Sequence, residues 1–236
     1  MKPLKLIKLL LLLLTTTLFA QQKPNWQPLL QGESFKGWTI KNGTATYTLE
    51  NGVVTGTTKL GTPNTFLCTD KMYTDFILEF EVWVDPTVNS GVQFRSNSFV
   101  AVHNGKVHGY QSEIDPSERA WSGGIFEEGL RGWLYNLENN PVGRKAFKNN
   151  QWNNYRVQAN GNHLSIWVNG INTANLKDNA TAEGFIGLQV HSIGNESQEN
   201  KKIKWRNIKI LTKDLKEHLI TPTAPLIDLT HKKRST

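Results

Sequence analysis

The feature that most constrains this sequence is a regular alternation of apolar and polar side chains in many short segments. In residues 76–85 (FILEFEVWVD) every second residue, from Phe76 to Val84, is apolar, and Glu79, Glu81 and Trp83 lie between them. Successive side chains of a strand point to opposite faces, so this period of two predicts a strand with one buried face. The same pattern recurs in SGVQFRS, GYQSEID, WNNYRVQANGNHLSIWVNG, GFIGLQVHS and IKWRNIKIL, whereas helical periodicity is nearly absent.

Tight turn signals separate these segments. An Asn-Gly pair interrupts residues 45–56 (ATYTLENGVVTG), and similar turns lie in residues 159–164 and 168–172. Asn-Gly between alternating strands is a strong hairpin signal. We therefore predict an all-β single domain, folded as an antiparallel β-sandwich or barrel. Residues 116–150 form the longest stretch without a strand pattern, and a loop of that length is usually functional or loosely ordered.

The N-terminus has the pattern of a secretory signal peptide. Three lysines precede the uninterrupted apolar run Leu9–Leu14, and a polar QQK follows Ala20. We expect cleavage after Ala20, which makes residues 1–20 the signal peptide and residues 21–25 a short linker. The sandwich would span residues 26–211 and a C-terminal tail residues 212–236. This organisation predicts an exported protein, periplasmic or extracellular, without stable membrane insertion once the signal is removed.

The amino-acid composition limits which classes of partner the protein is expected to bind. The formal charge is +7, but three lysines lie in the leader and HKKR near the C-terminus holds three more basic residues. No basic stripe is interleaved with aromatic residues, so no nucleic-acid partner is expected. Eight Trp and many Asn instead favour a carbohydrate, because indole faces stack on sugar C–H groups while amides and carboxylates bind hydroxyls. Cys68 is the single cysteine and is expected to be a buried small hydrophobe.

Three predicted strands carry an unusual set of polar residues opposite their apolar face. One strand contributes Gln93 and Arg95, the next contributes Gln111, Glu113 and Asp115, and a third contributes Gly187, Gln189 and His191. If the strands are neighbours, one face collects a cation, two acids, an imidazole and three amides. Such a set is typical of a substrate-facing wall rather than of a solvated sheet.

Structural roles compete with this interpretation. Glu113 and Asp115 could simply form ion pairs with Arg95 or Arg119. Placed two residues apart on one strand face, however, the two carboxylates repel each other, which favours a site. Glu113, Asp115 and His191 could also hold a divalent cation, although the residue types give this only weak support, and the sequence names no other cofactor.

The loop of residues 116–150 adds further candidates. Trp121, Arg131 and Trp133 could contact a sugar, and Arg131 lies close to two glycines that would let the backbone approach a ligand. The same residues could equally form a flap that fills the end of the sandwich. Both alternatives remain open from the sequence.

The ordered phrases SGVQFRS, GYQSEIDPSERAWSGGIFEEGLRGWLY, WNNYRVQANGNHLSIWVNGI, GFIGLQVHS and IKWRNIKI resemble the 3-keto-disaccharide hydrolase family, formerly a domain of unknown function. The opening WQPLLQGESFKGWTI is also similar to the start of that family. The resemblance implies an exported, concanavalin A-like (LamG-like) jelly roll that acts on glycosides oxidised to a ketone at C3. It also implies that Arg95, Glu113 and His191 correspond to residues of the family pattern.

This activity has a simple chemical basis. A ketone at C3 acidifies the proton on C2, so a base can form an enolate, and the C1 substituent then leaves by elimination. Addition of water gives net hydrolysis. We expect His191 or Glu113 as base, Arg95 or a bound cation as enolate stabiliser, and Asp115 or Glu113 as acid or hydroxyl ligand. Two other classes compete: a non-catalytic carbohydrate-binding module and a structural or adhesive exported domain.

Overall fold

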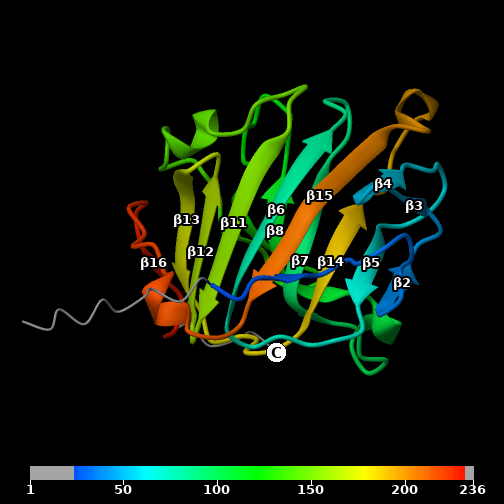
Figure 1. Cartoon of the computed structure of the whole chain (residues 1–236). Helices are drawn as coiled ribbons and strands as arrows, with labels where there is room; N and C mark the ends of the chain where they lie inside the picture. Colours follow the sequence, from blue (N-terminus) through cyan, green and yellow to red (C-terminus); the bar gives the residue numbers. More distant parts are fainter. Residues whose placement is uncertain (1–23, 232–236) are drawn as a thin grey trace, which may run out of the picture.

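The computed structural model of the protein describes residues 24–231 as two β-sheets packed one against the other (Figure 1). The first sheet has nine strands. Their order is β16 (Ile227–Asp228), β13 (Ile171–Lys177), β12 (His163–Val168), β11 (Asn153–Asn160), β6 (Phe76–Val84), β15 (Lys202–Leu211), β4 (Val53–Thr57) and β3 (Thr46–Glu50), and β1 (Gln27–Pro28) pairs with β15.

The second sheet has seven strands. Their order is β10 (Gly132–Tyr135), β9 (Ile125–Glu128), β8 (His108–Ile114), β7 (Ser90–Asn97), β14 (Phe185–Val190), β5 (Thr65–Thr69) and β2 (Trp38–Asn42). All pairs in it are antiparallel, and in the first sheet only β13 and β16 run parallel. The predicted all-β sandwich is confirmed.

Local sequence explains the individual strands. In β6 the residues predicted to face inward are all buried, while Glu79, Glu81 and Trp83 are partly exposed. The β3–β4 hairpin turns at Asn51 and Gly52, whose φ angles are 51° and 73°. Two successive positive φ angles define the turn that Asn-Gly favours, because this turn matches the twist of the flanking strands. The predicted β11–β12 and β12–β13 hairpins are present as well.

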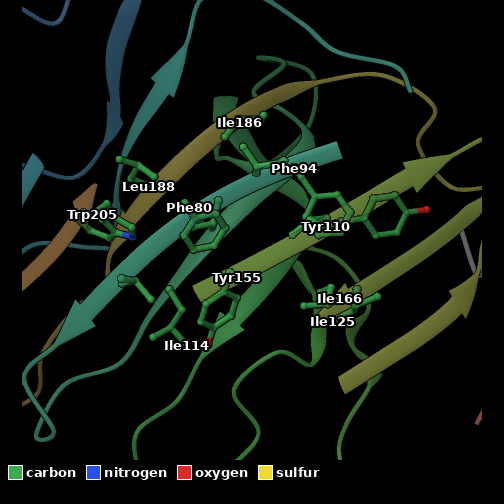
Figure 2. Packing of buried hydrophobic residues seen from close by; sticks show 14 of the residues in the cluster. Phe80, Phe94, Tyr110, Ile114, Ile125, Tyr155, Ile166, Ile186, Leu188 and Trp205 are labelled. Atoms are coloured by element: carbon green, nitrogen blue, oxygen red, sulfur yellow. The ribbon is translucent and has the colours of Figure 1, made fainter. Parts of the chain in front are cut away.

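The core lies between the sheets and is rich in aromatic rings (Figure 2). Phe80 of the first sheet stacks on Tyr155 with 5.0 Å between ring centroids, and Phe94 of the second stacks on Tyr110 at 5.6 Å. Trp205 of β15 is fully buried. Cys68 is buried too, as expected, and burial raises the pKa of its thiol, so it is a poor nucleophile.

Two regions are more ordered than the sequence suggested. Residues 116–150 are not one long loop, because β9 and β10 form a hairpin that extends the second sheet beyond β8. The segment that follows β15, expected to be a tail, packs on the domain: β16 pairs with β13, and Ala224 and Leu229 are buried. The predicted signal peptide and the last five residues lie outside the described residues.

Among the described residues, helical structure is limited to four short 3-10 turns, which cover His103–Gly105, Gly143–Lys145, Glu196–Gln198 and Leu215–Glu217. Within residues 24–231, no helix is long and apolar enough to cross a membrane.

Candidate active site

The three strands that carry the polar residues are neighbours, in the order β8–β7–β14. Their register places Gln93 opposite both Gln111 and Gly187, and Gly91 opposite both Glu113 and Gln189. Because this sheet's other face packs in the core, these side chains share its outward face. We call Gln93, Gln111, Glu113, Gln189 and the adjacent Glu128 the polar wall.

Hydrogen bonds connect the side chains of the polar wall in series. The Ser96 hydroxyl donates to Gln93 Oε1 at 2.7 Å, Gln93 Nε2 donates to Gln111 Oε1 at 2.5 Å, and Gln111 Nε2 donates to Glu113 Oε2 at 2.9 Å. Gly91 leaves room for this chain, since a Cβ there would lie 2.4 Å from Gln111 Cδ. The series fixes the orientation of every amide and ends on the Glu113 carboxyl group.

Glu113 is the electrostatically unusual residue of the wall. It is only 4% exposed, and Asn89 Nδ2 donates to its second oxygen at 2.7 Å. Burial raises the pKa of Glu113 to about 7; hydrogen bonds from Asn89 and Gln111 act against this shift, and the nearby charge of Asp115 adds to it. A carboxyl group with a pKa near neutrality can both accept and release a proton under physiological conditions.

Glu128 is a second carboxyl group on the same face, which the sequence analysis did not select. Asn64 Nδ2 donates to it at 3.2 Å and Gln189 Nε2 at 3.4 Å. Burial raises the pKa of Glu128, and the charge of Glu113 raises it further, while the Asn64 hydrogen bond and His191 oppose the rise. Within the described chain, the buried Oε1 of Gln189 has no hydrogen-bond partner, which leaves it an unused acceptor.

His191 follows β14 at the mouth of this face. Its Nδ1 lies 2.6 Å from the carbonyl oxygen of Ser192. A carbonyl oxygen only accepts, so Nδ1 carries the hydrogen and Nε2 is left for a ligand. His191 lines a cavity of about 250 Å³ together with Asn89 and Asp115. Asn89, which lines this cavity, also donates the hydrogen bond to Glu113.

Asp115 is held as a carboxylate by its neighbours. Burial alone would raise the pKa of Asp115, but hydrogen bonds from Ser117 and Arg119 outweigh it and keep the pKa below its usual range. Arg119 Nε lies 2.8 Å from Asp115 Oδ2. Asp115 therefore cannot donate a proton near neutrality, and it serves to hold Arg119.

Arg119 brings a cation to the polar wall. Its Nη2 lies 3.9 Å from Glu113 Oε1, and its guanidinium lies 4.7 Å and 5.1 Å from the ring centroids of Trp121 and Trp133. The two indoles meet edge to face at 4.7 Å. Cation–π contact and the Asp115 pair fix a side chain that is still 44% exposed. The predicted Trp121 and Trp133 thus lie beside the wall, with Arg119 between them and Glu113.

Arg95 does not lie on the polar wall, contrary to the sequence prediction. The β7–β8 register shifts between Phe94 and Asn97, and Arg95 has a φ of 45°, so this bulge breaks the alternation. Its guanidinium binds Asp75 at 2.7 Å and the carbonyl oxygens of Thr74 and Gly161 at 2.7 Å and 2.6 Å. The buried side chain ties the β11–β12 turn to the segment before β6.

The Arg131 side chain also binds groups outside the polar wall. It pairs with Glu127 and makes hydrogen bonds of 2.8 Å and 2.9 Å to the carboxylate of Asp178, which also accepts from the Tyr110 hydroxyl. These groups connect β8, β9 and the end of β13. The prediction that Arg131 presents a free guanidinium to a sugar is therefore not supported by its contacts. In the part of the chain that the structure describes, no three His, Cys, Asp or Glu side chains are grouped as a metal site requires.

An all-β sandwich with an acid and amide wall beside tryptophans has the groups that a carbohydrate site uses. A family model of the 3-keto-alpha-glucoside-1,2-lyase-like domain matches residues 25–211. The chain belongs to this family. No curated protein matches the chain.

Solved structures agree on the fold. A candidate glycosyl hydrolase from Parabacteroides distasonis superposes with a TM-score of 0.57 at 16% identity, covering 80% of this chain and 94% of that one. The carbohydrate-binding module CBM66 from Bacillus subtilis gives 0.52 at 18% identity, covering 78% and 99%. A Bacillus subtilis protein of unknown function with a galectin-like fold gives 0.56 at 10% identity, covering 79% and 94%. These likenesses show a jelly-roll fold shared by hydrolase-like and binding proteins.

Proposed function

We propose that this protein is an exported enzyme that cleaves glycosides carrying a ketone at C3 of the sugar, by removal of the C2 proton and elimination at C1. The observation that carries the proposal is Glu113, a buried carboxyl group with a pKa of about 7 at the end of a fixed amide series. Family membership supports the substrate class. The leader sequence of residues 1–20 supports export.

The reaction assigns a role to each group around Glu113. Its carboxylate takes the proton from C2, and the C2–H electron pair becomes the enolate, with negative charge on the C3 oxygen. Arg119 is the cation close to the base, so it takes the stabilising role first expected of Arg95. Electrons then return from the enolate to form the C1–C2 double bond as the C1–O bond breaks.

The leaving oxygen needs a proton, and the imidazolium form of His191 supplies it from Nε2, because Nδ1 is occupied by the carbonyl oxygen of Ser192. Water can then add to C1 and pass its proton to His191, while Glu113, whose proton has exchanged with solvent, protonates C2, which completes a net hydrolysis. If the unsaturated product leaves before water adds, the enzyme acts as a lyase. Glu128 and Gln189 hold sugar hydroxyls in this scheme, since one has a raised pKa and the other an unused acceptor.

A binding module is the second candidate, favoured by the likeness to CBM66 over nearly the whole of that module. A turnover assay distinguishes the enzyme from the binding module. The assay follows release of 4-nitrophenol from 4-nitrophenyl 3-keto-glucoside by the wild type, Glu113→Gln, His191→Ala and the control Glu118→Gln, whose carboxylate is exposed. We expect Glu113→Gln to lose about 10²- to 10⁴-fold in rate and Glu118→Gln none. Sugar binding without turnover by the wild type would support the module instead.

A further inference from the structure

A groove of about 890 Å³ crosses the outward face of the nine-stranded sheet, on the opposite side of the sandwich from the polar wall. Outward side chains of β6, β11, β12 and β15 form its floor. The N-terminal segment, with Trp26 and Leu30, and Ile220 of the C-terminal segment also line it. Its volume lies within the range of pockets that hold small ligands.

Four floor residues form one row across four strands. Trp167 of β12 lies opposite Arg156 of β11, Arg156 lies opposite Glu79 of β6, and Glu79 lies opposite Lys209 of β15. Neighbouring strands are about 4.8 Å apart, so the row spans roughly 14 Å. At its end, the Lys209 ammonium lies 4.8 Å from the ring centroid of Trp26. The row is long enough for an oligosaccharide rather than a single sugar.

Each charged group in this row is paired, because both cations share the one carboxylate. Glu79 pairs with Arg156 through one oxygen and with Lys209 Nζ at 3.0 Å through the other. Arg156 also donates to the carbonyl oxygen of His218 and to Gln158 Oε1. These bonds fix the side chains before a ligand arrives, which lowers the entropy cost of binding. The Glu79 carboxylate, 28% exposed, keeps lone pairs for further donors.

This chemistry discriminates among ligands. An anion or a cation would need an unpaired opposite charge, and the row offers none. An added peptide strand would need a free sheet edge, but the groove lies over the face of paired strands. Fixed donors and acceptors beside tryptophan and aliphatic surface suit hydroxyls and C–H groups. We propose that this groove is a second binding site, for a neutral oligosaccharide, independent of the function proposed for the polar wall.

The test is a calorimetric titration of the intact protein with maltohexaose, cellohexaose and laminarihexaose. We expect at least one to bind, Trp26→Ala to weaken that binding about tenfold or more, and Glu113→Gln to leave it unchanged. Trp83→Ala is the matched control, because Trp83 also lies near a lysine on this sheet, with Lys204 Nζ 5.6 Å from its ring centroid, but outside the groove.

Indole N–H signals provide a readout that does not depend on a folded variant. In the wild type, the signals of Trp26 and Trp167 should shift during the titration, and that of Trp83 should not. The proposal is wrong if none of the three oligosaccharides binds at millimolar concentration. It is equally wrong if Trp26→Ala binds as tightly as the wild type, or if Glu113→Gln loses the binding.

Discussion

Replacing Glu113 with Gln should change how the stability of the protein depends on pH. In the folded protein the pKa of Glu113 is raised from 4.5 to about 7. Because the folded-state pKa is the higher one, the stabilising contribution of the protonated group is fully present below pH 4.5. It is lost as the pH rises towards 7, since the unfolded chain releases the proton first. A difference of about 2.5 pKa units corresponds to about 3 kcal/mol.

Urea denaturation of the wild type and Glu113→Gln, from below pH 4.5 to above pH 7, measures this contribution. We expect the free energy of unfolding of the wild type to fall by about 3 kcal/mol relative to the variant, with most of the loss complete at pH 7. Glu118→Gln should follow the wild type, because its side chain is exposed. If the wild type and Glu113→Gln run parallel over this range, Glu113 ionises normally, and the raised pKa on which the proposal rests is wrong.

Three further predictions follow from the same contacts. Arg119→Gln should lower kcat by about 10²- to 10³-fold. In the wild type, kcat/KM should rise with pH through a midpoint near pH 7, and in Arg119→Gln this midpoint should move to higher pH, because the Arg119 charge lowers the pKa of Glu113. An unmoved midpoint would contradict this. Gly91→Ala should displace Gln111, since the new Cβ would lie 2.4 Å from its Cδ, and kcat should drop while the far-ultraviolet circular dichroism stays unchanged. Arg95→Met should cost about 1–3 kcal/mol of stability in urea denaturation, because the carbonyl oxygens of Thr74 and Gly161 lose their donor while Asp75 stays partly solvated. It should leave the pH profile of the folded enzyme intact; a shifted profile would show that Arg95 acts on the polar wall.

Local pattern was sufficient to predict most of the fold. The alternation in β6 and the Asn-Gly turns express backbone preferences that act over a few residues, and the sandwich follows from burying one face of each strand. The same reasoning predicted that Gln93, Gln111 and Gln189 share the face opposite the core, because their phase is fixed by the apolar residues between them. That their strands are neighbours was a condition that the sequence could not test, and the strand pairing fulfils it.

The errors arise where the structure depends on contacts distant in sequence. Arg95 has the right phase in the sequence, but the β7 bulge turns it towards Asp75, and no glycine marks that positive φ. Glu128 lies on a strand too short to show alternation, and it joins the wall only because β9 pairs with β8. The sequence indicates Arg119 only as an ion-pair partner, because its position relative to two indoles depends on the folded loop.

Exchange at C2 of the sugar tests the central claim most directly. Incubated with enzyme in D₂O, a 3-keto-glucoside should acquire deuterium at C2, in recovered substrate or in newly formed product, far faster than without enzyme, as followed by proton NMR. Glu113→Gln should abolish this enzymatic exchange, and Glu118→Gln should not. Cleavage by the wild type with the C2 proton fully retained would contradict abstraction by Glu113 and require a different chemistry at the polar wall.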